Sequence, residues 1–139
     1  MIQQISVNKI KPGEVAIIIP AYNEEENIER LIKKINFYVK KPIIVLVDDS
    51  PSFKTSDIIK NKKIKIKYYH RKIKAGRGSA IIFGIKKIIK NKKIKAVIEM
   101  DADFSHTPSE ITRNLNYFFK NKLNLLISSR YLKKSKILN

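Results

Sequence analysis

Short, β-branched apolar runs alternate with helical patterns along most of the chain. The first, second and fourth of these runs are nearly continuous, which is typical of strands buried on both faces of a sheet. The third alternates between Ile and Lys, and so predicts a strand with one face in water. The order of strands and helices predicts an α/β fold with a parallel-rich central sheet and helices on both faces. The five runs are Val15–Ile19, Ile43–Val47, Ile64–Tyr69, Ala96–Met100 and Leu123–Ser128.

The segments between the runs carry apolar residues at helical spacing. Asn23 is the expected N-cap of the first helix, because three glutamates follow it where the helix dipole favours acids. A second helix is expected from about Thr55 or Ser56, and a third over about residues 79–90. Pro108 is expected to begin the fourth, since proline is favoured at the first helical position. A chain of 139 residues fits a single domain.

Acidic residues cluster just after three of the predicted strands. In a parallel sheet, ligands bind at the edge where the carboxyl ends of the strands meet. The chain has only 12 acidic residues, so their concentration at this edge is not expected from composition. The three segments concerned are Pro20–Glu25, Asp48–Ser50 and Asp101–Asp103.

Asp101 and Asp103 are the candidate metal ligands. Two carboxylates two residues apart after a strand can share one divalent cation, which would then bridge to a diphosphate. The chain has no cysteine and only two histidines, so oxygen ligands and therefore Mg²⁺ or Mn²⁺ are expected. In the alternative interpretation, Asp103 or Ser105 merely caps the helix that begins near Pro108. The other two segments at the same edge favour the metal site.

The formal net charge is +18, and the excess is mostly lysine. Such a charge attracts nucleic acid, anionic lipid or phosphorylated substrates, but lysine-rich composition alone would also produce it. The lysines are spread along the chain without a nucleic-acid motif, so no specific nucleic-acid binding is predicted. We expect a cytoplasmic protein, because no signal peptide is visible and every apolar run is far below the roughly 18 residues of a spanning helix.

The ordered motifs of the chain resemble those of family 2 glycosyltransferases with the GT-A fold, especially the polyprenol-phosphate (dolichol-phosphate) sugar transferases. The resemblance runs through almost the whole chain. The matching segments are Val15–Glu26, Val47–Ser50, the pattern His70-Arg71, Lys74, Gly76, Gly78, Ala80 and Gly84, then Met100–Asp103 with His106, Pro108 and Glu110, and finally Ser129–Tyr131.

The resemblance implies a role for each matched site residue. Asp49 would accept a hydrogen bond from a ring nitrogen of the nucleotide base, and Asp48 would support that turn. Asp101 and Asp103 would hold the metal against the diphosphate, with Ser105 as a shorter oxygen donor beside them. Arg130 would lie near the acceptor or donor phosphates. The other residues expected to contact the nucleotide sugar are Pro20, Ala21, Tyr22, Glu24, Lys74, Gly78, Asp101 and Ala102.

The chain departs from the family pattern at three places and at its end. Ser105 stands where relatives usually carry glutamine, the turn after Asp49 lacks the usual Asp-Gly, and Arg77 replaces a leucine between the two glycines. Family members continue well past the predicted fifth strand. We therefore expect residues 1–139 to form one nucleotide-sugar-binding domain whose acceptor-side C-terminal part is missing, and no residue is a candidate catalytic base.

The resemblance implies an inverting transfer of a hexose from a GDP- or UDP-sugar to a polyprenyl phosphate at the cytoplasmic face of a membrane. Three alternatives remain open. The acceptor could be a sugar hydroxyl in polysaccharide or glycan synthesis. The chain could be a catalytically silent nucleotide-binding module. A basic nucleic-acid binder is permitted by the charge alone. The donor sugar, the base and the oligomeric state are not indicated by the sequence.

Overall fold

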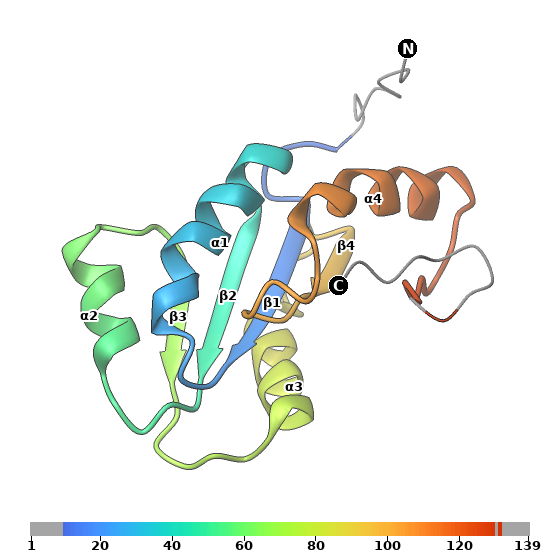
Figure 1. The fold of residues 1–139 in the computed structure, drawn as a ribbon. Coiled ribbons are helices and arrows are strands. Elements are labelled where there is room, and N and C mark those ends of the chain that lie inside the picture. Colours follow the sequence, from blue (N-terminus) through green and yellow to red (C-terminus); the bar gives the residue numbers. More distant parts are fainter. Residues whose placement is uncertain (1–9, 130, 132–139) are drawn as a thin grey trace.

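The computed structural model describes residues 10–129 and Tyr131. Its centre is a four-stranded parallel sheet in the order β3-β2-β1-β4 (Figure 1). The strands are β1 (Val15–Ala21), β2 (Ile43–Asp48), β3 (Lys67–His70) and β4 (Ala96–Glu99). The helices are α1 (Glu25–Tyr38), α2 (Lys54–Asn61), α3 (Arg77–Ile88), the short 3₁₀ helix η1 (Pro108–Glu110) and α4 (Ile111–Lys120).

Helices cover both faces of the sheet, as predicted. One face packs against apolar side chains of α1, α2 and α4, and the other packs against α3 (Figure 1). Each strand is connected to the next strand along the chain by way of a helix, which is the usual way to join parallel strands. The predicted α/β architecture is therefore confirmed.

Strand β1 lies at the centre and explains why its sequence is a continuous apolar run. Val15, Ile17 and Ile19 point into the core beneath α1, whereas Ala16 and Ile18 point into the core beneath α3. All five are at most 1% exposed. Because both faces of β1 are buried, neither set of alternating positions can be polar.

Gly84 allows α3 to lie very close to the sheet. A Cβ atom at this position would stand 2.7 Å from Cγ2 of Ile18 and 3.4 Å from Cγ2 of Val47. Both neighbours are fully buried, so neither can move aside cheaply. The absence of a side chain at Gly84 therefore sets the distance between α3 and β1.

The predicted fifth strand is not present. The described residues of Leu123–Ser128 form no strand, and Leu125 and Ile127 are 73% and 75% exposed. These apolar side chains are not buried against the sheet, so the run lacks the packing that stabilises a strand. In the described part of the chain, β4 is the edge of the sheet on this side.

Several element boundaries also differ from the prediction; for example, α3 spans Arg77–Ile88 rather than about residues 79–90. The N-cap position of α1 is Glu24 rather than Asn23, which has a left-handed backbone with φ of 56°, and the Glu24 side chain makes no capping hydrogen bond. Strand β3 begins at Lys67 rather than Ile64. Ile64 and Ile66 instead pack against the core on the α1 face before the strand pairs with β2.

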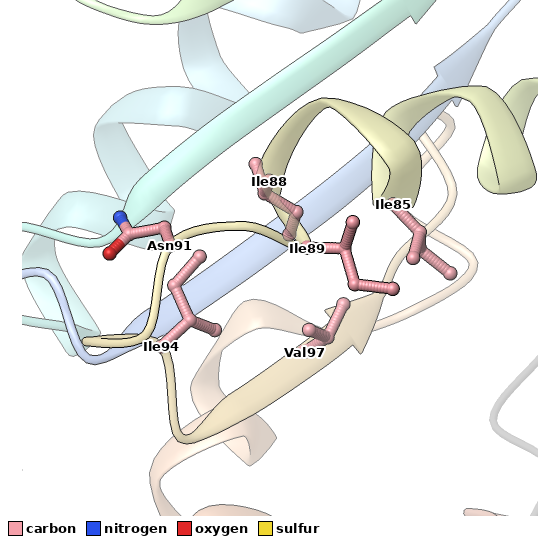
Figure 2. Close-up of a pocket in the computed structure, with 6 residues that line it drawn as sticks. All are labelled: Ile85, Ile88, Ile89, Asn91, Ile94 and Val97. Carbon is pink, nitrogen blue, oxygen red and sulfur yellow. The ribbon is translucent and has the colours of Figure 1, made fainter.

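Two apolar hollows of the surface lie away from the carboxyl ends of the strands. Figure 2 shows one groove formed by the last turn of α3, the following loop and the start of β4, lined by Ile85, Ile88, Ile89, Asn91, Ile94 and Val97. A second lies at the beginnings of β2 and β3. Among the residues that the structure describes, no helix has both the length and the apolar character needed to cross a membrane.

Candidate functional site

The carboxyl ends of β1, β2 and β3 are joined by backbone hydrogen bonds beyond the strands themselves. Ala21 lies opposite Asp48 in the register of β1 and β2. The N–H of Asp49 donates to the carbonyl of Ala21 at 3.0 Å, and the N–H of Arg71 donates to the carbonyl of Asp48 at 2.8 Å. The predicted convergence concerns the ends of β1, β2 and β4, and it is present, because β4 also pairs with β1 and the N–H of Met100 donates to the carbonyl of Ile18 at 3.1 Å.

Asp48 is a fully buried carboxylate that organises the turn after β2. Its Oδ1 accepts hydrogen bonds from the N–H of Ser50, at 2.9 Å, and from the Ser50 hydroxyl. Its Oδ2 accepts from the hydroxyl of Tyr68 at 2.9 Å. Burial, followed by this hydrogen bond, raises the pKa of Tyr68 above its usual value. Asp48 thus supports the turn from within, and its oxygens face protein donors rather than a ligand.

Asp49 forms a bidentate ion pair with Arg71. The Nε and Nη2 atoms of Arg71 donate to Oδ1 and Oδ2 of Asp49, both at 2.5 Å. The N–H of Ala75 also donates to Oδ2 at 3.3 Å. The hydrogen bond with Asp49 raises the pKa of the Arg71 guanidinium. A carboxylate has about four acceptor positions, so these three hydrogen bonds leave one position on Oδ1 unused in a side chain that is 6% exposed.

Tyr22 and Lys74 meet at the same edge from two different loops. The Nζ atom of Lys74 lies 3.9 Å from the centre of the Tyr22 ring, which is close enough for a cation–π contact. Tyr22 is 41% exposed and follows Ala21, which is buried, and Pro20, which is half-buried. The carboxylate of Glu24 accepts a hydrogen bond from the side-chain amide of Asn27 at 2.7 Å. The structure therefore brings the expected base-side residues together around an exposed aromatic ring.

The loop after β4 is closed by its own hydrogen bonds. The N–H of Asp101 donates to Nδ1 of His106 at 3.1 Å, and the N–H of Ser105 donates to Oδ1 of Asp103 at 2.9 Å. Hydrogen bonds from Ser105 lower the pKa of Asp103 below its usual value. Asp103 is exposed, so an ionised carboxylate is presented to solvent at this edge.

Ala102 and Phe104 anchor this loop. Ala102 is 2% exposed and belongs to the core beneath α1. Phe104 has a left-handed backbone with φ of 65°, and its ring lies 4.4 Å from the guanidinium carbon of Arg30. Phe104 also packs against the core on the α1 face. The loop is therefore held by residues that alternate with the two candidate metal ligands.

Arg77 is the residue of this site that sequence reasoning did not place. Its Nε donates to Oδ1 of Asp101 at 2.8 Å, and its Nη2 forms an ion pair with Glu99. The hydrogen bond with Asp101 raises the pKa of Arg77. From the sequence, Arg77 is only a departure from the family's leucine. Nothing local predicts that the first residue of α3 reaches the end of β4.

The first turn of α3 links the base side of the edge to the metal side. Arg71 donates from Nη1 to the hydroxyl of Ser79 at 2.8 Å, while Arg77 reaches Asp101. Gly76 caps the helix with φ of 84°, a conformation that side chains rarely adopt. Gly78 is exposed, and a Cβ there would meet no atom within 4 Å, so its backbone is open to a ligand. Arg130, the remaining expected site residue, lies outside the described residues.

The donor set at the end of β4 suits Mg²⁺ or Mn²⁺ only as a partial site. Within residues 10–129 and Tyr131, no group of three or more His, Cys, Asp or Glu side chains could hold a metal. Asp101 and Asp103 supply two carboxylates, and Mg²⁺ is commonly bound by one or two carboxylates together with substrate phosphates. Two carboxylates are too few to hold a cation alone, so a diphosphate and water would have to supply the remaining ligands.

Comparison with known proteins assigns the family. The family model described as glycosyl transferase family 2 matches residues 16–139. Among curated relatives, a dolichol-phosphate mannosyltransferase of Pyrococcus furiosus is 34% identical over 132 residues, covering 91% of this chain and 36% of the relative. A polyprenol monophosphomannose synthase of Mycolicibacterium smegmatis is 31% identical over 120 residues, covering 84% and 44%.

A third relative, an undecaprenyl-phosphate mannosyltransferase of Micrococcus luteus, is 30% identical over 128 residues, covering 90% of this chain and 51% of the relative. The chain thus spans about half, or less, of the length of these three relatives. The parallel sheet, with helices on both faces and acidic loops at its carboxyl edge, agrees with the GT-A fold. The chain belongs to glycosyl transferase family 2.

Proposed function

We propose that this chain binds a nucleotide-diphospho-sugar at the carboxyl edge of its sheet and contributes to the inverting transfer of the hexose to a polyprenyl phosphate. One observation carries the proposal. The loops after β1, β2 and β4 bring an exposed tyrosine, the Asp49 carboxylate and the Asp101–Asp103 pair to one edge, in a family 2 chain. The names of three relatives, each a polyprenyl- or dolichyl-phosphate mannose transferase, support the acceptor class.

The donor would lie across the loops in the order base, ribose, diphosphate. Tyr22 and Pro20 would line the base and ribose pocket with Ala21 and Glu24, and the free position on Oδ1 of Asp49 would accept from the base. Support comes from the Arg71 fork, which fixes the orientation of this carboxylate. Lys74 would approach the phosphates. The open backbone at Gly78, in the first turn of α3, supports close approach of the nucleotide there.

The diphosphate end would lie at Asp101, Ala102 and Asp103. Bound Mg²⁺ or Mn²⁺ would neutralise the negative charge that grows on the departing diphosphate. Asp101 and Asp103 would hold the cation, and Ser105 would orient Asp103 through the hydrogen bond it already donates. Because the loop is anchored by Ala102 and Phe104, these carboxylates would be positioned before the substrate binds.

The acceptor phosphate would be the nucleophile. One of its oxygens forms a bond to the anomeric carbon while the bond from that carbon to the nucleotide diphosphate breaks, which inverts the configuration. An ionised phosphate needs no catalytic base, so catalysis would depend on positioning and charge stabilisation. Arg130 would contact these phosphates. Activity of this kind belongs to the whole protein, because the chain spans only part of its relatives.

We place the acceptor at the cytoplasmic face of a membrane, with peripheral contact through the carboxyl edge. Phe53 and Ile73 support this orientation, since they lie in two loops at that edge and are 60% and 78% exposed. Large apolar side chains beside lysines are common on surfaces that contact lipid. Lys72 and Lys74 flank Ile73 in the same loop.

The donor proposal is tested by calorimetric titration of the chain with GDP and with UDP, each with and without Mn²⁺. We expect one nucleotide to bind in a metal-dependent way and Asp103→Ala to abolish the metal dependence. Asp57→Ala is the matched control, because Asp57 is an exposed aspartate on α2 outside the candidate site. It should bind like the wild type.

Binding that is equal with and without Mn²⁺, and unchanged in Asp103→Ala, would overturn the metal role of this loop. The absence of binding to either nucleotide would overturn the donor site proposed for this chain, whereas nucleotide binding without transfer by the full-length protein would favour the catalytically silent module. The acceptor is tested on the full-length protein. The protein is incubated with undecaprenyl phosphate in vesicles and with mannose or glucose linked to whichever of GDP and UDP binds, and mass spectrometry identifies the product. Transfer only to a glycan hydroxyl would replace the lipid-phosphate acceptor with the alternative one.

A further inference from the structure

Arg77 places a positive charge directly on one of the two candidate metal ligands. Its Nε lies 2.8 Å from Oδ1 of Asp101, and its Nη2 pairs with Glu99 at the end of β4. The side chain of Arg77 is 52% exposed and that of Asp101 is 29% exposed. The contact is therefore accessible to an incoming cation rather than sealed in the core.

The fold places the backbone of Arg77 where its side chain can reach the end of β4. It is the first residue of α3, and α3 is held against β1 by the close contact at Gly84. Two carboxylates, from Glu99 and Asp101, hold the same guanidinium from one strand end. A guanidinium bound in this way is restrained more strongly than one in a single exposed ion pair.

We propose that Arg77 is a resident cation which competes with Mg²⁺ or Mn²⁺ for Asp101, so that the metal binds well only together with the nucleotide diphosphate. This inference rests on the proposed function, since it takes Asp101 and Asp103 as the metal ligands. In the empty site, a divalent cation must displace or approach the guanidinium, and like charges repel. The empty site therefore has a low affinity for metal.

The diphosphate changes this balance because it brings negative charge that two cations can share. A guanidinium binds phosphate oxygens with two parallel hydrogen bonds, so Arg77 can leave Asp101 for the diphosphate without losing an anionic partner. Asp101 is then free for the metal. Binding of metal and nucleotide becomes mutually dependent, and each raises the affinity of the other by the same factor.

The test measures Mn²⁺ binding itself, by electron paramagnetic resonance of free Mn²⁺, with and without the nucleotide that the calorimetry identifies. Arg77→Leu removes the guanidinium and restores the residue type of the family pattern. Without nucleotide, we expect this variant to bind Mn²⁺ about tenfold more tightly than the wild type, because the metal no longer has to break one charge-assisted hydrogen bond. With nucleotide, the difference should fall to about threefold or less.

Arg113→Leu is the matched control. Arg113 is an exposed arginine on α4 that pairs with Glu110 at 2.9 Å, away from the candidate site. It should leave Mn²⁺ binding unchanged in both conditions. Arg77→Lys, which keeps the charge, should stay closer to the wild type than Arg77→Leu does. Circular dichroism of each variant checks that the fold is intact.

Two failures are distinguishable. Equal Mn²⁺ affinities for the wild type and Arg77→Leu, both lost in Asp103→Ala, would overturn the role of Arg77 and leave the metal site standing. If Mn²⁺ binds neither protein, with or without GDP or UDP, the proposed metal site fails and the role of Arg77 fails with it. An equal difference with and without nucleotide would overturn the coupling.

Discussion

The loops at the two ends of the sheet differ in charge. At the amino end, the loops that lead into the four strands carry ten lysines and one acid. At the carboxyl end, the loops that follow the strands carry four acids and three residues of Lys or Arg. The lysines are Lys11, Lys40, Lys41, Lys62, Lys63, Lys65, Lys90, Lys92, Lys93 and Lys95, with Glu14 as the acid. The carboxyl-end residues are Glu24, Asp49, Asp101 and Asp103, with Arg71, Lys72 and Lys74.

The two ends also use their charges differently. The ten lysines at the amino end are exposed, and they lie in loops after helix C-termini or before β1, where positive charge suits the helix dipole. At the carboxyl end, Asp48, Asp49 and Asp101 each accept hydrogen bonds from side chains or backbone of other elements or loops. The net charge therefore says little about the ligand, because half of the +18 lies about 20 Å from the candidate site along β1.

The largest expected effect comes from removing the buried carboxylate that organises the carboxyl end. Asp48→Ala leaves Ser50 and the Tyr68 hydroxyl without their acceptor, so the free energy of unfolding should fall by about 3 kcal/mol. Lys92→Ala, at the amino end, should change it by less than about 0.5 kcal/mol. Urea unfolding followed by circular dichroism measures both. Similar losses at the two ends would break the contrast between them.

Arg71→Ala should be the next most damaging change. It leaves the Asp49 carboxylate, which is 6% exposed, without its partner, at a cost of about 2–3 kcal/mol in unfolding free energy. Nucleotide binding should also be lost, since Asp49 would no longer be oriented. Arg71→Lys should recover part of the stability but not the bidentate geometry. Full nucleotide affinity in Arg71→Ala would show that this ion pair serves stability alone.

Tyr68→Phe should have a moderate effect that depends on pH. Losing the hydrogen bond to Asp48 should lower the unfolding free energy by about 1–2 kcal/mol at pH 7. The pKa of Tyr68 is raised in the folded state, so its contribution is complete below the ordinary pKa of tyrosine and is lost as pH rises above it. The difference between wild type and Tyr68→Phe should therefore shrink above about pH 10. A constant difference from pH 7 to 11 would contradict this explanation.

The smallest effect is expected from the lysines. Replacing Lys40, Lys62, Lys92 and Lys93 with glutamine should change the Kd for the nucleotide by less than about threefold at 150 mM salt, because the screening length is then about 8 Å. Calorimetry at 150 mM and at 20 mM salt tests this. A tenfold loss at 150 mM would mean that the amino end takes part in recognition, and would remove the distinction between the two ends.

The sequence predicts the layers of this fold well because burial on both faces leaves a strong local pattern. Ile17 and Ile18 lie on opposite faces of β1, and both must be apolar. The same reasoning fails for Leu125 and Ile127, whose apolar run predicts a strand although neither side chain is buried. An apolar run predicts a buried strand only if another part of the fold lies against it, and the run itself does not show this.

The candidate site is predicted in its location but not in its connections. Because Asp49 and Asp101 each follow the end of a predicted parallel strand, the sequence predicts them at one edge of the sheet. In the structure they lie at that edge. Which donors those acids bind depends on loops distant in sequence. Arg71 is 22 residues from Asp49, and Arg77 is 24 residues from Asp101. No local spacing rule indicates such pairs, so Arg77 is recognisable in the sequence only as an unexpected residue.

The close approach at Gly84 has a consequence for how this chain tolerates mutation. Gly84 lies seven residues after Arg77, about 10 Å along the axis of α3. A larger residue at Gly84 would lift the helix from Ile18 and carry the guanidinium away from Asp101 with it. In a mutational scan, position 84 should therefore resemble an active-site position in its intolerance of change, although Gly84 is buried on the side of α3 that faces the sheet, away from the proposed ligand.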